Sequence, residues 1–312
     1  MRTVLFHRKY RRFHGGHLKV WHYFNHVLAT PGYDARVLFD ANSAWDNSNP
    51  WIGARDRALG SLDGFTPDVL FVAGRDWQRL EGLGLLDGDI PIVNLIQHVR
   101  HADEWSIQSQ YLTRKAIRIC VSPEVEEAVV AAGSNGPTVV IPNGMDIPEI
   151  ATEAEERPVD LLIAGLKQPV LARRVAEALA SPDLAIEVLT DHVDQAAFFG
   201  AMRRAQVTLF LPNEEEGFYL PAIEGMALGT VVVCPDCVGN RSFCLPGVNA
   251  CRPEYRFEEV VEAAQAAMAL PEGERRRLLD NAREMASRHS MAAERDAFGR
   301  VLRELDRLWV SG

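Results

Sequence analysis

Two glutamates that lie eight positions apart, Glu216 and Glu224, have the spacing in this chain that most clearly indicates chemistry. Glu216 precedes a short turn at 217–220, and Glu224 lies in the helix-like run that follows. The segment before them, QVTLFL at 206–211, is short and apolar, which is typical of a buried parallel strand. A strand, a tight turn and a helix direct backbone N–H groups and the positive end of a helix dipole towards an anion. With a carboxylate on either side to accept hydrogen bonds from hydroxyl groups, this layout predicts a nucleotide-sugar site.

The segment resembles the E-x7-E signature of retaining glycosyltransferases of the GT-B fold, in particular their family 4. The resemblance implies that Glu216 is catalytic and faces the transferred sugar, whereas Glu224 accepts hydrogen bonds from the ribose of the donor. It also implies donor contacts from the turn itself, at Gly217, Phe218, Tyr219 and Leu220. The alternative is an amphipathic helix with a solvated acidic cap, which the Gly-Phe-Tyr-Leu-Pro turn and the apolar run at 225–233 disfavour.

Short apolar segments alternate with helical stretches in both halves of the chain, which predicts parallel sheets with helices on both faces. In the first half these segments are residues 3–7, 35–39, 69–72, 91–96, 117–121 and 138–141. The pattern restarts after an acidic stretch at 149–158 that is typical of a linker. The segments of the second half are residues 159–164, 185–189, 206–211 and 230–234.

We therefore expect an α/β protein of GT-B architecture, with two Rossmann-like domains facing each other across a cleft. Residues 1–148 would form the acceptor domain, and residues 159–290 the nucleotide-sugar domain. Residues 291–312 predict a final helix with an apolar stripe. The resemblance implies that this helix crosses back onto the first domain, and a helix packed on its own domain is the alternative.

Composition and charge narrow the function classes. Hydrophobic content of 47% and charged content of 24% are those of a soluble globular protein, and no apolar run approaches the ~18 residues of a membrane span. Because the N-terminus also lacks an apolar signal core, we expect a cytoplasmic protein. The net charge of −10 argues against nucleic acid as a partner. Residues 2–19 nevertheless contain six lysines and arginines and no acid, so Arg11 and Arg12 are predicted to bind an anionic acceptor or to face a membrane surface.

Loops that follow parallel strands are where α/β proteins bind ligands. Gly15 and Gly16 follow the first strand and would allow backbone amides to approach the donor or the acceptor closely. The resemblance places a catalytic histidine in the loop after 91–96, where His98 is the first match. His101 is the second candidate, and we otherwise expect it at the acceptor.

The departing diphosphate accumulates negative charge, so its site requires a cation. Many members of the resembled family carry Gly-Arg after the strand that corresponds to 159–164, but this chain has Leu166 in place of that arginine. We expect Lys167 and Arg173 to bind the diphosphate in its place, and Arg174 is a further candidate. The turn that contains Gly239 and Asn240 resembles the family's glycine turn beside the donor pocket.

No metal and no cofactor are expected. Asp87-Gly88-Asp89 spells the metal-binding DxD of another glycosyltransferase fold, but it precedes a strand and is typical of a turn. Cys234 and Cys237 form a CxxC without the second pair that structural zinc requires, so reduced thiols are the favoured interpretation.

Together with these observations, the resemblance implies a metal-independent, retaining hexosyltransferase that uses a nucleoside diphosphate sugar. Its acceptor would be a glycan or a lipid-linked glycan in cell-surface polysaccharide assembly, and a lipid-linked acceptor would bring the enzyme to the inner face of the cytoplasmic membrane. The alternatives are a nucleotide-sugar 2-epimerase of the same architecture and a nucleotide-sugar-binding subunit without activity.

Overall fold

The computed structural model describes residues 1–12, 15–146 and 156–311. The chain divides into two compact units. The first unit is Met1–Asn143 together with Ala292–Gly312, and the second unit is Gly144–Met291. Phe13 and His14, which precede the predicted ligand-binding glycines Gly15 and Gly16, and most of the predicted linker at 149–158 lie outside the described residues.

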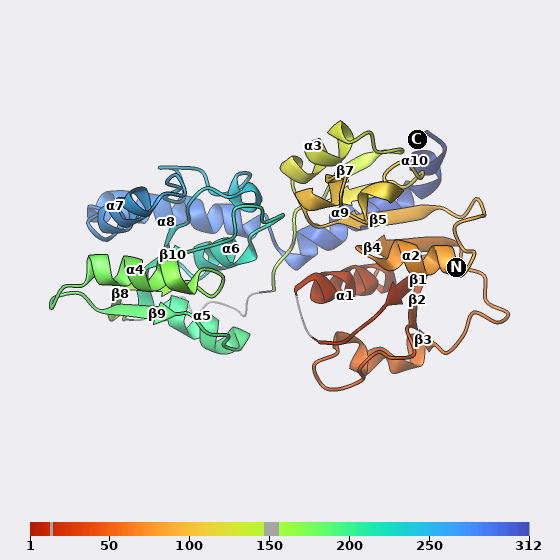
Figure 1. Cartoon of the computed structure of the whole chain (residues 1–312), viewed down its shortest axis with the longest axis horizontal. Coiled ribbons are helices and arrows are strands. Elements are labelled where there is room, and N and C mark those ends of the chain that lie inside the picture. The colour runs from red at the N-terminus through yellow and green to blue at the C-terminus, as the bar shows by residue number, and fades with distance from the viewer. Residues whose placement is uncertain (13–14, 147–155, 312) are drawn as a thin grey trace. The chain divides into compact units, whose positions relative to one another are not determined.

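The first unit contains a seven-stranded parallel sheet with the strand order β3-β2-β1-β4-β5-β6-β7 (Figure 1). Its strands are β1 (Arg2–Arg8), β2 (Tyr33–Phe39), β3 (Ala58–Leu59), β4 (Val69–Ala73), β5 (Ile92–Ile96), β6 (Ile117–Cys120) and β7 (Thr138–Val140). Its helices before the linker are α1 (Gly15–Leu28), α2 (Asp76–Gly82) and α3 (Pro123–Ala131), with 3-10 turns η1 (Pro50–Arg57), η2 (Val99–Ala102) and η3 (Ser109–Tyr111). All six segments expected from the sequence form strands, and the two-residue β3 is added to them.

Two helices from the end of the chain, α9 (Met291–Arg303) and α10 (Leu305–Ser311), complete the first unit. The expected single helix is thus interrupted at Glu304. Glu294 of α9 is buried and forms an ion pair with Lys19 of α1, with 2.6 Å between Oε2 and Nζ. On the same helix, the Phe298 ring packs edge-on against Tyr23 with 4.8 Å between the centroids. These contacts fix α9 to the start of the chain.

The second unit contains a four-stranded parallel sheet with the order β11-β10-β8-β9 (Figure 1). The strands are β8 (Val159–Ala164), β9 (Ile186–Leu189), β10 (Ala205–Phe210) and β11 (Val231–Val233). The helices are α4 (Pro169–Leu179), α5 (Gln195–Arg204), α6 (Leu220–Ala227), α7 (Phe257–Met268) and α8 (Glu272–Ser287), with the 3-10 turn η4 at Val238–Asn240.

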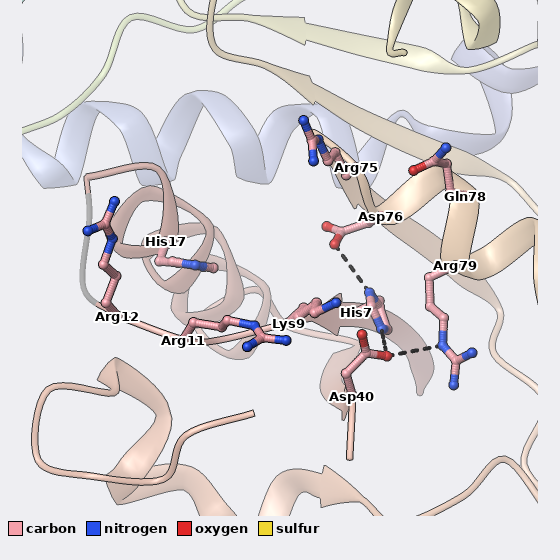
Figure 2. Close-up of a pocket in the computed structure, with 10 residues that line it drawn as sticks. All are labelled: His7, Lys9, Arg11, Arg12, His17, Asp40, Arg75, Asp76, Gln78 and Arg79. Atoms are coloured by element: carbon pink, nitrogen blue, oxygen red, sulfur yellow. Dashed lines mark hydrogen bonds and ion pairs between the residues drawn. The ribbon is translucent and has the colours of Figure 1, made fainter. Parts of the chain in front are cut away.

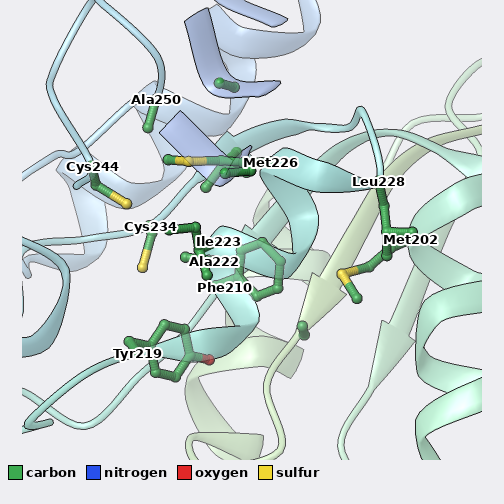
Figure 3. Packing of buried hydrophobic residues seen from close by; sticks show 14 of the residues in the cluster. Met202, Phe210, Tyr219, Ala222, Ile223, Met226, Leu228, Cys234, Cys244 and Ala250 are labelled. Atoms are coloured by element: carbon green, nitrogen blue, oxygen red, sulfur yellow. The ribbon is translucent and has the colours of Figure 1, made fainter. Parts of the chain in front are cut away.

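Both faces of this second sheet are covered, because successive side chains along each strand enter different cores. On β8, for example, Leu161 and Ile163 belong to the core that contains residues of α4 and α7, whereas Leu162 belongs to the core that contains residues of α6. Helix α6 lies very close to β10 in this second core, since a Cβ built on Gly225 would lie 2.8 Å from the Phe210 ring. Figure 3 shows this packing around Phe210. The core thereby fixes the helix that carries Glu224.

Candidate functional site

The loops after β8 and β10 bring Lys167 and Glu216 together. These strands are neighbours, and Ala164 at the end of β8 pairs with Phe210 at the end of β10, so the two loops start side by side. The Lys167 ammonium forms an ion pair with Oε1 of Glu216. The glutamate side chain is 15% exposed and the lysine side chain 42% exposed, so the pair is open to a ligand. Two residues predicted to be catalytic thus share one site in the second unit.

The turn that follows Glu216 is anchored by the loop at 234–240. The Tyr219 backbone N–H donates to the Gly239 carbonyl over 2.8 Å. A Cβ on Gly239 would lie 2.8 Å from both the Glu216 carbonyl oxygen and the Phe218 nitrogen. Only glycine fits there without moving the backbone that carries Glu216, so Gly239 allows the two loops to lie directly against each other.

The side chain of Asn240 serves the same loop. It is fully buried, its amide nitrogen donates to the Pro235 carbonyl at 2.9 Å, and its Oδ1 accepts from the Cys237 N–H at 3.2 Å. Asn240 was expected to contact the donor. In the structure, the polar atoms of its side chain instead form hydrogen bonds within the loop at 234–240.

The aromatic residues of the turn face the protein. Tyr219 is buried in the second core with its ring 6.2 Å from Phe210, and burial raises the pKa of its phenol well above the usual value. The ring of Phe218 lies 5.0 Å from that of Phe243. Their side chains anchor the turn, Gly217 between them and Glu216 is buried, and Leu220 is the first residue of α6.

Glu224 lies on α6 with its carboxylate partly covered by the protein. Within the described part of the chain, its side chain has no hydrogen bond or ion pair. Burial raises the pKa of Glu224 from 4.5 to about 7. A carboxylate that has lost water without gaining a partner is suited to accept hydrogen bonds from the hydroxyl groups of a ligand.

The other expected cations in this unit point elsewhere. Arg173 is exposed on α4, where its guanidinium lies 3.5 Å from the Thr190 hydroxyl. The Arg174 guanidinium packs 4.6 Å from the centroid of the Phe257 ring. Lys167, which also lies 5.3 Å from the Tyr219 ring centroid, is thus the cation that the structure places beside Glu216.

The two candidate histidines lie in the first unit, just after β5 as expected. His98 caps η2, and its Nδ1 accepts from the backbone N–H of Arg100 at 3.0 Å. Burial, together with the charges of His98 and Arg100, lowers the pKa of His101 to about 4, so this ring is neutral at pH 7. The geometry leaves both histidines as candidates.

A second candidate site is a cavity of about 740 Å³ within the first unit (Figure 2). It lies where β1, β2 and β4 end. Its lining residues are His7, Lys9, Arg11, Arg12, His17, Asp40, Arg75, Asp76, Gln78 and Arg79. Arg11 and Arg12 were expected at an acceptor site, and the structure adds Asp40, which follows β2, and residues 75–79 at the start of α2. Gly15 and Gly16 form the first turn of α1, and no atom lies within 4 Å of a Cβ built on Gly15.

Sequence reasoning missed Asp40, Arg75, Asp76 and Arg79. The available signal was their position after strands β2 and β4, the same rule that pointed to His98. Gly74 marks the second of these turns, since its φ of +59° is one that glycine adopts readily.

Among the described residues, no group of three or more His, Cys, Asp or Glu side chains could hold a metal ion. No helix in the described ranges has the length and apolar character needed to span a membrane.

The arrangement of the strands and helices is that of GT-B glycosyltransferases, which confirms the predicted fold. Anabaena HepE in complex with UDP and glucose is similar over 98% of this chain and 100% of its own, with a TM-score of 0.74 and 14% identity. Sucrose-phosphate synthase from Thermosynechococcus elongatus is similar over 98% of this chain and 100% of its own, with a TM-score of 0.73 and 14% identity. The lipopolysaccharide outer core galactosyltransferase WaaB is similar over 97% of this chain and 99% of its own, with a TM-score of 0.69 and 14% identity.

Residues 145–270, which lie within the second unit, match the family model described as "Glycosyl transferases group 1". This match supports a glycosyltransferase. No curated protein matches the sequence significantly.

Proposed function

We propose that the chain is a retaining, metal-independent hexosyltransferase that uses a nucleoside diphosphate sugar. The observation that carries the proposal is the Lys167–Glu216 pair, which stands at the carboxyl ends of two neighbouring strands and is held in place by Gly239. The family match over the same unit supports it. The acceptor would be a glycan or a lipid-linked glycan in cell-surface polysaccharide assembly.

Each residue of the site has a role in this reaction. On binding of the donor, Lys167 would exchange Glu216 for the diphosphate and stabilise the charge that develops as the diphosphate leaves. Glu216, released from the lysine, would orient the sugar and stabilise positive charge at the anomeric carbon. Glu224 would accept hydrogen bonds from the ribose. The departing phosphate oxygen would take the proton of the acceptor.

A nucleotide sugar is also the ligand class of a structural neighbour, since Anabaena HepE has been solved in complex with UDP-glucose. UDP-glucose is therefore the first donor to test.

The test is replacement of Glu216 by glutamine in the full chain, with Glu214→Gln as the matched control from the exposed part of the same loop. The Glu216 variant should lose at least about a hundredfold in transfer, comparable to the loss of one group that stabilises a transition state, and should retain its circular dichroism spectrum. The control should keep normal activity. A Glu216 variant with near-normal kcat would contradict the role assigned to this carboxylate.

The identity of the products tests the class of reaction. Nuclear magnetic resonance of the glycoside should show the anomeric configuration of the donor, and an inverted product would refute retention. An altered sugar formed from the donor alone would instead indicate a 2-epimerase. Tight donor binding without turnover on any glycan would indicate a non-catalytic subunit.

A further inference from the structure

The cavity of the first unit has an excess of positive charge that the protein does not neutralise. Its lining has five basic side chains and two carboxylates, in a chain whose net charge is −10. The basic residues are Lys9, Arg11, Arg12, Arg75 and Arg79, and the carboxylates are Asp40 and Asp76. Within the described ranges the first four of these cations have no ion pair.

The two carboxylates are occupied by partners around the cavity. Asp76 accepts from Arg8 at 2.9 Å, lies 3.2 Å from Nδ1 of His7, and accepts from the Ala73 backbone N–H at 3.2 Å. Asp40 is 3.1 Å from Nε of Arg79 and 3.3 Å from the other nitrogen of His7. Figure 2 shows His7 between the two carboxylates. This network fixes one side of the cavity and leaves its remaining cations available to a ligand.

The positive charge of the unpaired cations in the cavity favours a ligand with more than one negative charge. A phosphate monoester carries about −1.5 to −2 at pH 7 and has three acceptor oxygens, whereas a carboxylate carries a single charge. Arginine matches phosphate through parallel N–H donors. The volume of about 740 Å³ falls within the roughly 300–1,000 Å³ of small-molecule sites, so it admits a sugar ring as well as the phosphoryl group.

We propose that this cavity binds the phosphoryl group of a phosphorylated acceptor, held by Arg11, Arg12 and Arg75. The inference rests on the proposed function, in which the diphosphate of the donor is bound in the other unit by Lys167. The same phosphoryl chemistry could come from a water-soluble sugar phosphate or from a lipid-linked sugar phosphate.

The test measures binding to the full chain by isothermal titration calorimetry, without turnover. The probes are glucose 6-phosphate, unphosphorylated glucose, inorganic phosphate, and a short-chain polyprenyl phosphate in detergent micelles. The variants are Arg11→Ser with Arg12→Ser, and separately Arg75→Ser. The matched control is Arg276→Ser with Arg277→Ser, two exposed arginines of α8 in the second unit.

Wild type and the control should bind glucose 6-phosphate or the polyprenyl phosphate at least about tenfold more tightly than glucose, a difference of about 1.4 kcal/mol. Inorganic phosphate should compete for the same site. Each arginine variant should lose at least tenfold in affinity for the phosphorylated probe. Binding should weaken as salt rises from 50 to 300 mM, because the attraction between charges is screened. Preference for the soluble or the lipid probe identifies the source of the phosphate.

Three results would overturn the inference: no phosphorylated probe binds, the probes bind equally well to the arginine variants, or the variants lose UDP-glucose instead of the sugar phosphate. UDP-glucose binding by the same samples tests the proposed function separately. Glucose 6-phosphate binding that depends on the arginines, in a protein that binds no nucleotide sugar, would refute the glycosyltransferase and leave the phosphate site standing.

Discussion

Replacing Glu224 with glutamine should stabilise the ligand-free protein at neutral and alkaline pH. Burial raises the pKa of this carboxyl from 4.5 to about 7, and no group among the described residues bonds to its charged form. Folding therefore favours the protonated acid. With respect to this group, stability is highest below about pH 4.5 and is lost as the pH rises towards 7, because the unfolded chain releases the proton more easily than the folded one.

The shift in the pKa of Glu224 gives the size of the expected change in the free energy of unfolding. One pKa unit corresponds to about 1.4 kcal/mol, so the shift from 4.5 to about 7 corresponds to at most roughly 3 kcal/mol. Partial contact of the side chain with solvent reduces this to about 1–3 kcal/mol. Glutamine does not ionise, so the stability difference between the variant and wild type should be near zero at pH 4.5 and reach that range at pH 8.

The assay is urea unfolding followed by far-ultraviolet circular dichroism, with hydrogen exchange of the α6 peptide. All six tryptophans belong to the first unit, so their fluorescence does not report on α6. Glu262→Gln, at an exposed position of α7, is the control and should show no such pH dependence. A difference that is the same at both pH values, or a Glu224 variant that is less stable at pH 8, would refute the reasoning.

The same residue links stability to the proposed reaction. Hydrogen bonds from ribose hydroxyls favour the charged carboxylate, so UDP-glucose binding at pH 7 should release protons from wild type but not from the glutamine variant. Calorimetry in two buffers with different ionisation enthalpies measures this release. The variant should also bind the donor about tenfold more weakly, since a charged acceptor contributes about 1.5–3 kcal/mol. Equal proton release in both proteins would remove Glu224 from the ribose site.

Gly239→Ala should reduce transfer at least about a hundredfold with little change in circular dichroism, because its Cβ would displace the backbone of Glu216; normal kinetics would show that the loop tolerates the shift. Lys167→Met should lower kcat and kcat/KM together, as expected for a group that acts in the transition state, and an effect on donor KM alone would argue for simple binding. Glu294→Gln should destabilise the first unit by about 3–5 kcal/mol, measured by tryptophan fluorescence in urea, because it removes the negative charge that compensates the buried Lys19 ammonium; a loss below 1 kcal/mol would contradict this. Transfer should persist in excess chelator, and loss of activity that manganese or magnesium restores would refute the metal-independent reaction.

The strands could be predicted from the sequence because each has a short apolar segment bounded by turn residues. The β8 segment, for example, has the predicted limits of 159 and 164. The break at Glu304 between α9 and α10 could not, since the apolar stripe continues through it: Leu302 before the break and Leu305 after it are both buried.

In the candidate site, too, some features could be predicted from the sequence and others could not. The proximity of Lys167 and Glu216 follows from strand order, because loops leaving neighbouring parallel strands meet at one edge. The inward orientation of Tyr219 and the internal hydrogen bonds of Asn240 depend on packing between loops that are distant in sequence, which local pattern does not encode. The position of Asp76 after β4 was a signal in the sequence, whereas its contacts with His7 and Arg8 depend on the pairing of β4 with β1.

The fixation of α9 to α1 has a consequence for the synthesis of the chain. The second unit is continuous from Gly144 to Met291, so all its parts are available before residue 292 is added. The first unit begins the chain but needs Ala292–Gly312 to complete its core, including the partner of Lys19. Chains grow at about 5–20 residues per second, so roughly 8–30 seconds separate the synthesis of β7, the last strand of the first sheet, from that of α9. During that interval the apolar surface that contacts α9 and the side chain of Lys19 are exposed. We therefore expect a chain that is stopped at residue 291 to aggregate through its first unit, although its second unit can fold.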